Sequence, residues 1–388
     1  MSLSNPEGDP SLIDFIRNRI LRDGPVPFRW FMEQALYHPH HGYYAAGKAA
    51  IGRRGDYFTN VSVGPLFGKL LAGQFHEMWE RMGQPPHFTI VEQGANNGDF
   101  ARDVLTALQS TAPDFFAAVK YRIVEPFPIL QERQRQTLAA FSQVEWHTSF
   151  TDLLPFSGVH FSNELVDAMP VHLVKYTGGA WKERHVDWQN DRFEFLDAPL
   201  SSPKLAGNLE KLPHIAIENY ITEINLDALD WIDSLAARLE SGFALIVDYG
   251  WPRDIFYAPD RTTGTLTCYS QHQRSYDPLQ NAGNSDITAH VDFTTLAGRA
   301  EATGFRLAGF ADQHHFMVGL GKKEFPDTDQ PADPARMKSL RAFHTLMHPA
   351  LMGLAFKFLA LEKNLAKEST TPLAGFQFSP NPKAALGI

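Results

Sequence analysis

The chain has 388 residues, of which 44% are hydrophobic and 20% are charged, a balance typical of a folded globular protein rather than a disordered one. Its 35 Lys and Arg residues against 44 Asp and Glu residues give a net charge of −9, which opposes general binding to nucleic acid or anionic lipid. No stretch approaches the roughly 20 apolar residues that span a bilayer. We therefore expect no nucleic-acid partner and no membrane partner.

Cys268 is the only cysteine, which excludes an intramolecular disulfide and a cysteine-based zinc site within one chain. Glu7 and Asp9 precede the first apolar run, unlike the start of a signal or transit peptide. We therefore expect a cytoplasmic location. The histidines between residues 38 and 41 and the pair His314-His315 lack the carboxylate or cysteine complement of a metal site, so we predict no metal.

The first 86 residues are predicted to form a mainly helical N-terminal region. Apolar residues recur at helical spacing over 12–20, 28–36 and 66–78, with a break at Gly24-Pro25. The pattern then changes at Pro85-Pro86.

Residues 87–325 are predicted to form a Rossmann-like α/β core. Short apolar runs predict strands at 88–91, 121–124, 144–146 and 159–161, and helices with apolar faces are predicted over 100–108 and 130–138. Such alternation of strands and helices is typical of a parallel sheet.

The core is predicted to contain an insertion at about 171–215. Short strands around Gly178-Gly179 and Asn190-Asp191 predict a β-meander. Asn225 is expected to cap a helix that runs to Leu239 and ends at Gly242, before an apolar strand over 243–247.

The last third of the chain is predicted to hold a long loop, a helix and a helical extension. The polar stretch 251–286 suits a loop over a site, and 294–303 has helical spacing. Residues 305–321 are expected to supply two closing strands, and 334–365 a long helix. Residues 326–388 are therefore predicted to be a C-terminal helical extension and tail.

The turn after the first core strand carries Glu92, Gly94, Asn96 and Gly98, at the position where a cofactor lies in a Rossmann-like sheet. Glu125 ends the next strand, within the range where an acid meets ribose hydroxyls. We predict that these residues bind an adenosyl group. The spacing fits a nicotinamide dinucleotide equally, and a tight turn or a solvated strand-end acid would explain the same residues.

A third cluster, at 161–170, begins at the end of a predicted strand and contains Asn163, Glu164 and Asp167. Ligands of open α/β sheets gather at such ends, so we place Asn163 with the cofactor and the two acids with the reaction. The alternative is a helix cap formed by Asn163 and Asp167.

These clusters resemble the MidA-like family of S-adenosylmethionine-dependent methyltransferases, over about residues 28–360. Similar stretches are ALYHPHHGYY (35–44), GDYFT (55–59), the turn at 92–98, NELVDAMP (163–170), DYG (248–250) and DITAHVDF (286–293). The resemblance implies a class I methyltransferase fold, S-adenosyl-L-methionine as cofactor and, as in the family's mitochondrial member in respiratory complex I assembly, arginine methylation of a protein.

The sequence departs from the family pattern at two places. Asn96 stands at the middle glycine of Glu-x-Gly-x-Gly-x-Gly, and Thr59-Asn60-Val61 lacks an acid that relatives carry. The first departure bears on cofactor binding and the second on substrate choice.

For an arginine acceptor, Glu164 and Asp167 would hold the guanidinium, which resists deprotonation. His290 is a candidate general base, and a structural histidine is the alternative. Three other functions stay open: a small-molecule O- or N-methyltransferase, a non-catalytic assembly module that retains the fold, and a dinucleotide oxidoreductase. The partner is a protein or small-molecule methyl acceptor, and the sequence leaves open whether the chain forms a homodimer.

Overall fold

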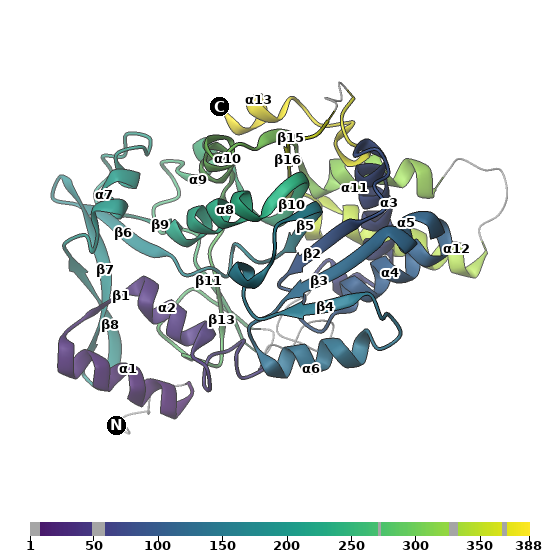
Figure 1. Cartoon of the computed structure of the whole chain (residues 1–388). Helices are drawn as coiled ribbons and strands as arrows, with labels where there is room; N and C mark the ends of the chain where they lie inside the picture. The colour runs from purple at the N-terminus through teal and green to yellow at the C-terminus, as the bar shows by residue number, and fades with distance from the viewer. Residues whose placement is uncertain (1–7, 49–58, 271–272, 326–332, 367–370) are drawn as a thin grey trace. The chain divides into compact units, whose positions relative to one another are not determined.

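The computed structural model describes residues 8–48, 59–270, 273–325, 333–366 and 371–388 (Figure 1). By the contacts among its residues the chain divides into two compact units. The meander unit comprises Met1–Tyr57, Val166–Asp230 and Arg253–Val291; the core unit comprises Phe58–Leu165, Trp231–Pro252 and Asp292–Ile388. This division differs from the three predicted regions, because residues 166–230 and 253–291 fold with the N-terminal helices.

The core unit is built on a mixed sheet in the order β15–β16–β10–β5–β2–β3–β4, with the two-residue β14 (Val291–Asp292) beside β10. The five strands from β10 to β4 are parallel, and β16 runs antiparallel to both of its neighbours. This confirms the predicted Rossmann-like sheet. The strands are β2 (Phe88–Gln93), β3 (Val119–Val124), β4 (Val144–His147), β5 (Phe156–Asn163), β10 (Leu239–Trp251), β15 (Arg306–Asp312) and β16 (Phe356–Lys363).

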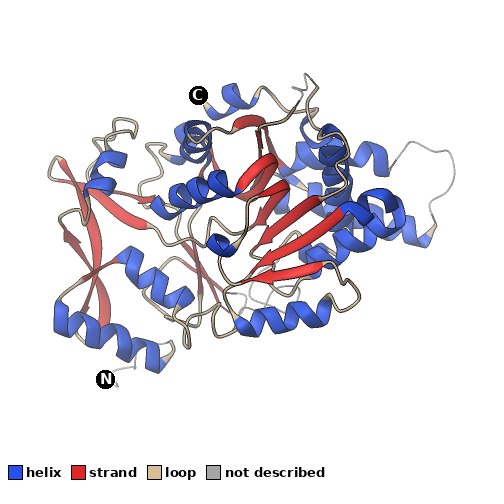
Figure 2. Cartoon of the chain, in the orientation of Figure 1, coloured by secondary structure: helices blue, strands red, loops and turns tan. Residues whose placement is uncertain are grey.

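Helices cover both faces of this sheet (Figure 2). Successive residues of a strand point to opposite faces. On β5, the ring of Phe161 stacks on Phe100 of α4 at 4.2 Å, whereas His160 lies edge-on to Trp231 of α8 at 5.5 Å. The core-unit helices are α3 (Leu66–Arg81), α4 (Asp99–Thr111), α5 (Pro113–Ala118), α6 (Pro128–Thr137), α10 (Phe293–Ala302), α11 (Gln313–Glu324), α12 (Pro334–Met347) and α13 (Pro382–Leu386), together with the end of α8 (Leu226–Arg238).

Two predictions near the C-terminus are wrong. Residues 305–321 form one strand, β15, followed by α11 rather than a second strand. The predicted long helix stops at Met347, and a π-helical turn (Pro349–Gly353) separates it from β16. Because β16 is buried on both faces, its apolar residues run on without alternation, and such a run does not distinguish a strand from a buried helix.

The meander unit contains the predicted β-meander, β6 (His172–Thr177), β7 (Ala180–Gln189) and β8 (Arg192–Ala198). Both connecting turns have the positive φ angles of two-residue hairpins, at Gly178-Gly179 and at Asn190-Asp191. β1 (Val26–Pro27) and β9 (Tyr220–Ile224) complete this sheet. Buried side chains of α1 (Pro10–Asp23) and α2 (Phe28–Tyr37) share a core with Val171, Leu173 and Val186.

The predicted long loop over 251–286 is in part regular structure. It contains α9 (Arg253–Phe256), β11 (Thr267–Ser270) and β12 (Gln273–Ser275), and β13 (Asp286–Thr288) pairs with β11. The strands here are only three or four residues long, so their alternation is too short to recognise in the sequence.

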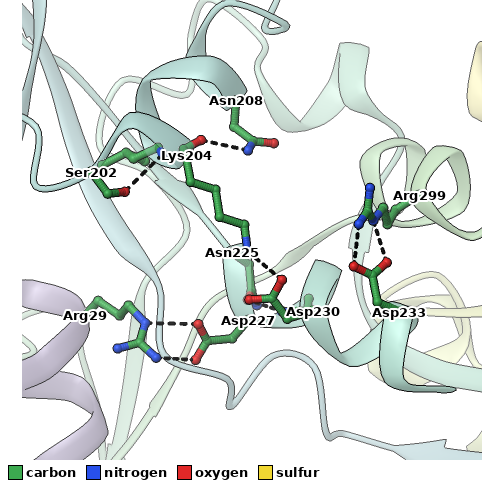
Figure 3. A network of polar contacts seen from close by, with 11 residues as sticks. Arg29, Ser202, Lys204, Asn208, Asn225, Asp227, Asp230, Asp233 and Arg299 are labelled. Carbon is green, nitrogen blue, oxygen red and sulfur yellow. Dashed lines mark hydrogen bonds and ion pairs between the residues drawn. The ribbon is translucent and has the colours of Figure 1, made fainter. Parts of the chain in front are cut away.

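Polar contacts within each unit join segments that are distant in the chain (Figure 3). In the meander unit, Arg29 donates two hydrogen bonds to Asp227, at 3.0 and 2.8 Å. In the core unit, the guanidinium of Arg299 makes the same two-pronged contact with Asp233. Asn225 caps α8 as predicted, since its Oδ1 accepts from the N–H of Ala228 at 2.9 Å. Within the described ranges, no helix is long and apolar enough to cross a membrane.

Candidate functional site

The turn between β2 and α4 keeps the geometry of a glycine-rich turn despite the asparagine at its centre. Gly94 and Gly98 have φ angles of +80° and +81°, and Asn96 has a φ of +45°. Asparagine is among the few non-glycine residues that adopt this left-handed region at low cost. The N–H of Gly98 donates to the carbonyl of Ala95 at 2.8 Å and closes the turn. The departure at Asn96 therefore leaves the backbone of the turn intact.

Glu125 lies at the same sheet edge as this turn. Gln93 and Val124 are paired in the parallel strands β2 and β3, so Gly94 and Glu125 follow neighbouring positions. The carboxylate accepts from the N–H of Phe127 at 3.1 Å and from Nε2 of Gln134 at 3.0 Å. Burial raises the pKa of Glu125 to about 7, although both hydrogen bonds favour the ionised form.

Glu92 lies within β2, one position before its end, and is buried. Its Oε2 accepts a hydrogen bond of 2.6 Å from the hydroxyl of Tyr121. Burial also raises the pKa of Glu92 to about 7, and the nearby charge of Asp99 adds to the rise. One oxygen of this carboxylate is therefore engaged with the sheet itself.

Asn163 ends β5 and lies between two polar side chains of the core unit. Its Oδ1 accepts from Nδ2 of Asn60 at 3.2 Å, and its Nδ2 donates to Oε1 of Glu164 at 2.9 Å. Glu164 has a φ of +55°, which is uncommon for this residue type, and its N–H donates to the carbonyl of Val247 at 2.9 Å. No helix follows β5 before β6, so the alternative that Asn163 and Asp167 cap a helix is wrong.

The other two predicted catalytic residues, Asp167 and His290, lie in the meander unit. Asp167 is 3% exposed, and its carbonyl accepts from the N–H of Ala289 at 2.9 Å, next to His290. The N–H of His290 donates to Oγ1 of Thr265 at 3.0 Å. In turn the N–H of Thr265 donates to a carboxylate oxygen of Glu223 at 2.6 Å. The fold thus brings Asp167 and His290 from separate parts of the sequence to adjoining positions of one unit.

Two residues that the sequence did not single out complete the core-unit arrangement. Asn60 is fully buried and bonds to Asn163, and its only signal in the sequence was its place in the stretch Thr59-Asn60-Val61, which departs from the family pattern. Gln134 is fully buried and bonds to both Glu125 and the carbonyl of Asn96. It lies on a helix whose other Gln and Arg residues are half-buried or exposed, so the sequence pattern does not distinguish it.

The core-unit residues fit an adenosyl cofactor. Buried acceptor atoms of three side chains, Asn60 Oδ1, Asn96 Oδ1 and Ser162 Oγ, have no hydrogen-bond partner among the described residues. Such atoms are costly unless a ligand or water supplies donors, and the ammonium, ribose and adenine groups of S-adenosylmethionine are donors. Gly98 caps α4 without a side-chain bond, so the first N–H groups of that helix are available to an anionic group.

Comparison with known families and proteins supports the same chemistry. Residues 70–311 match the model of a family described as "Putative S-adenosyl-L-methionine-dependent methyltransferase". The mitochondrial protein arginine methyltransferase NDUFAF7 homolog of Drosophila melanogaster is 29% identical, over 95% of this chain and 89% of its own length. The human NDUFAF7 is 28% identical, over 88% of this chain and 81% of its own.

The fold also matches a solved structure with a bound cofactor product. A protein from Burkholderia thailandensis in complex with S-adenosyl-homocysteine aligns with a TM-score of 0.84 and 31% identity, over 97% of this chain and 98% of its own. The cofactor is therefore S-adenosyl-L-methionine, which decides against the dinucleotide and non-catalytic alternatives. This chain belongs to the family of S-adenosyl-L-methionine-dependent methyltransferases whose model it matches.

Proposed function

We propose that this methyltransferase modifies arginine side chains of a protein substrate. The observation that carries the proposal is the hydrogen bond from the N–H of Ala289 to the carbonyl of Asp167, which joins the backbone of a buried aspartate to the segment that carries His290. A carboxylate and an imidazole suit the binding of a guanidinium and the removal of its proton. Relatives that cover most of this chain are named protein arginine methyltransferases.

S-adenosylmethionine supplies an electrophilic methyl group, so the protein's task is to align the acceptor and exclude water. In the proposed mechanism, Asp167 holds the acceptor guanidinium, which stays charged until the transfer. His290 then accepts the proton that the methylated nitrogen releases. Glu125 would accept from the ribose hydroxyls, and Glu92, Gly94, Asn96, Gly98 and Asn163 would hold the rest of the cofactor.

The test is to incubate the protein with methyl-labelled S-adenosylmethionine and a lysate of its own source, and to identify labelled peptides by mass spectrometry. We expect methylarginine. Label confined to the small-molecule fraction would instead favour a small-molecule methyltransferase. Asp167→Asn and His290→Gln should each lower labelling at least about tenfold. The first variant removes the carboxylate proposed to bind the acceptor, and the second removes the base proposed to take its proton. Both variants should keep wild-type affinity for S-adenosylhomocysteine.

We also propose that the protein acts in the cytoplasm, on the basis of its single cysteine, Cys268, which is buried in the fold. The curated relatives are named as mitochondrial, so the two locations differ. Fractionation of cells that carry a C-terminally tagged chain distinguishes them, and recovery in organelles or membranes would contradict the proposal.

A further inference from the structure

Gln134 of α6 joins three parts of the core unit through one fully buried amide. Its Nε2 donates to the carbonyl of Asn96 at 2.8 Å and to Oε2 of Glu125 at 3.0 Å. Its Oε1 accepts from the indole Nε1 of Trp146, on β4, at 3.1 Å. The side chain thus contacts the turn after β2, the end of β3 and the end of β4 together.

The chemistry of the three partners permits only one orientation of this amide. An indole N–H can only donate, whereas a carbonyl and a carboxylate oxygen can only accept. A reversed amide would therefore lose all three contacts and leave buried groups unsatisfied, which costs more than the bonds contribute when formed. The two hydrogens on Nε2 are donated to the carbonyl of Asn96 and to Oε2 of Glu125. Because the amide group is planar and rigid, it fixes the distance between these two acceptors.

The contacts of Glu125 leave it suited to a vicinal diol. Oε1 accepts from the N–H of Phe127 and Oε2 accepts from Nε2 of Gln134, so each oxygen has one such donor among the described residues. A carboxylate oxygen has two lone pairs, so one acceptor site on each oxygen remains for the 2′- and 3′-hydroxyls of a ribose.

We infer that Gln134 is a positioning residue for the adenosine half of the cofactor: it orients the carboxylate of Glu125 toward the ribose and ties it to the turn at 94–98. The inference rests on the proposed role of Glu125 and of this turn in cofactor binding. It assigns Gln134 no contact with the reacting groups, so its loss should weaken cofactor binding through Glu125.

The experiment measures binding by titration calorimetry for S-adenosylhomocysteine and for its 2′,3′-dideoxy analogue. Gln134→Met keeps the size of the side chain but removes the three contacts, and we expect about a tenfold loss of affinity for S-adenosylhomocysteine. The analogue lacks the hydroxyls that would donate to Glu125. The affinity of the same variant for the analogue should therefore fall less than about threefold. A merely structural defect would lower the affinity for both ligands equally.

Gln134→Glu is the second variant, because it preserves the shape and the acceptor for Trp146 and places a carboxylate beside Glu125. It should lower the affinity for S-adenosylhomocysteine more than Gln134→Met does, since like charges repel. Gln136→Met is the matched control: Gln136 is exposed on the same helix and bonds to Glu132 at 2.9 Å. Circular dichroism shows which variants remain folded.

Wild-type affinity in a folded Gln134 variant, or equal losses for both ligands, would overturn the inference while the proposed cofactor site stands. Failure of the wild-type protein to distinguish S-adenosylhomocysteine from the dideoxy analogue would instead remove Glu125 from the ribose site. In that case the proposed assignment itself is wrong.

Discussion

The hydroxyl of Tyr121 donates a 2.6 Å hydrogen bond to Oε2 of Glu92, between neighbouring strands and away from solvent. Burial raises the pKa of both groups, that of Glu92 to about 7 and that of Tyr121 well above its ordinary value. The phenol therefore stays protonated and remains a donor while the carboxyl beside it titrates near neutrality. This contact, which depends on the protonation of Glu92, lies directly before the turn at 94–98.

Tyr121→Phe should destabilise the fold by about 1–3 kcal/mol, because it leaves a buried carboxyl without its donor. The free energy of unfolding is measured by urea denaturation at pH 7. Tyr276→Phe is the control, since Tyr276 is 68% exposed. Equal stability of Tyr121→Phe and wild type would mean that the hydroxyl contributes nothing to the folded state.

Stability should fall as the pH rises from 5 to 8, partly because of Glu92. Its pKa is about 7 in the folded protein against an ordinary value of 4.5, so the unfolded chain loses the proton first. The contribution is complete below the lower value and is lost as the pH passes the higher one. Glu92→Gln removes this titration, so its stability relative to wild type should rise by up to about 3 kcal/mol across that interval.

Thermal unfolding of both proteins at several pH values between 5 and 8 measures this difference. Glu125 has a similarly raised pKa and remains in the variant, so the slope should decrease rather than vanish. Glu132→Gln, on the surface of α6, is the control. A pH-independent difference between Glu92→Gln and wild type would contradict the raised pKa.

Asn96→Gly should fold normally and keep affinity for S-adenosylhomocysteine within about tenfold of wild type, since glycine adopts the same φ and only one acceptor is lost. Asn96→Val should destabilise the protein by about 1–2 kcal/mol, because a β-branched residue is strained there. Asn281→Val is the matched control: Asn281 has a φ of +55° in the meander unit. It should show the same destabilisation with no loss of affinity in the folded protein.

Thr265→Val should lower methyl transfer more than about fivefold while cofactor binding is unchanged. It removes the hydroxyl that accepts from the N–H of His290, so the backbone of His290 is no longer fixed by this hydrogen bond. The measurements are labelling of the lysate and calorimetry with S-adenosylhomocysteine. Thr288→Val, on β13, is the control and should leave labelling unchanged. Full labelling by Thr265→Val would argue that His290 is only a structural histidine.

Most of the core unit could be predicted from local patterns. Each strand from β2 to β5 lies where a short apolar run ends in a polar residue. In the meander unit, the helix cap by Asn225 and the turn at Gly178-Gly179 likewise depend on residues close together in the chain. Those signals depend on residues a few positions apart, so the sequence displays them directly. The string GDYFT lies almost entirely outside the described residues, at 55–58, so the structure does not address it.

The sequence by itself determined the kind of sheet, the position of the turn at 92–98 and of Glu125 after neighbouring strands, and the resemblance that implies S-adenosylmethionine. Only the tertiary structure decided that Phe356–Lys363 is a strand inside the sheet, that Gln134 meets Glu125, and that Asp167 adjoins His290. The physical reason is that pairing across a sheet and contacts between buried side chains depend on segments distant in the chain. A local pattern indicates which residues are buried, but not which residues they contact.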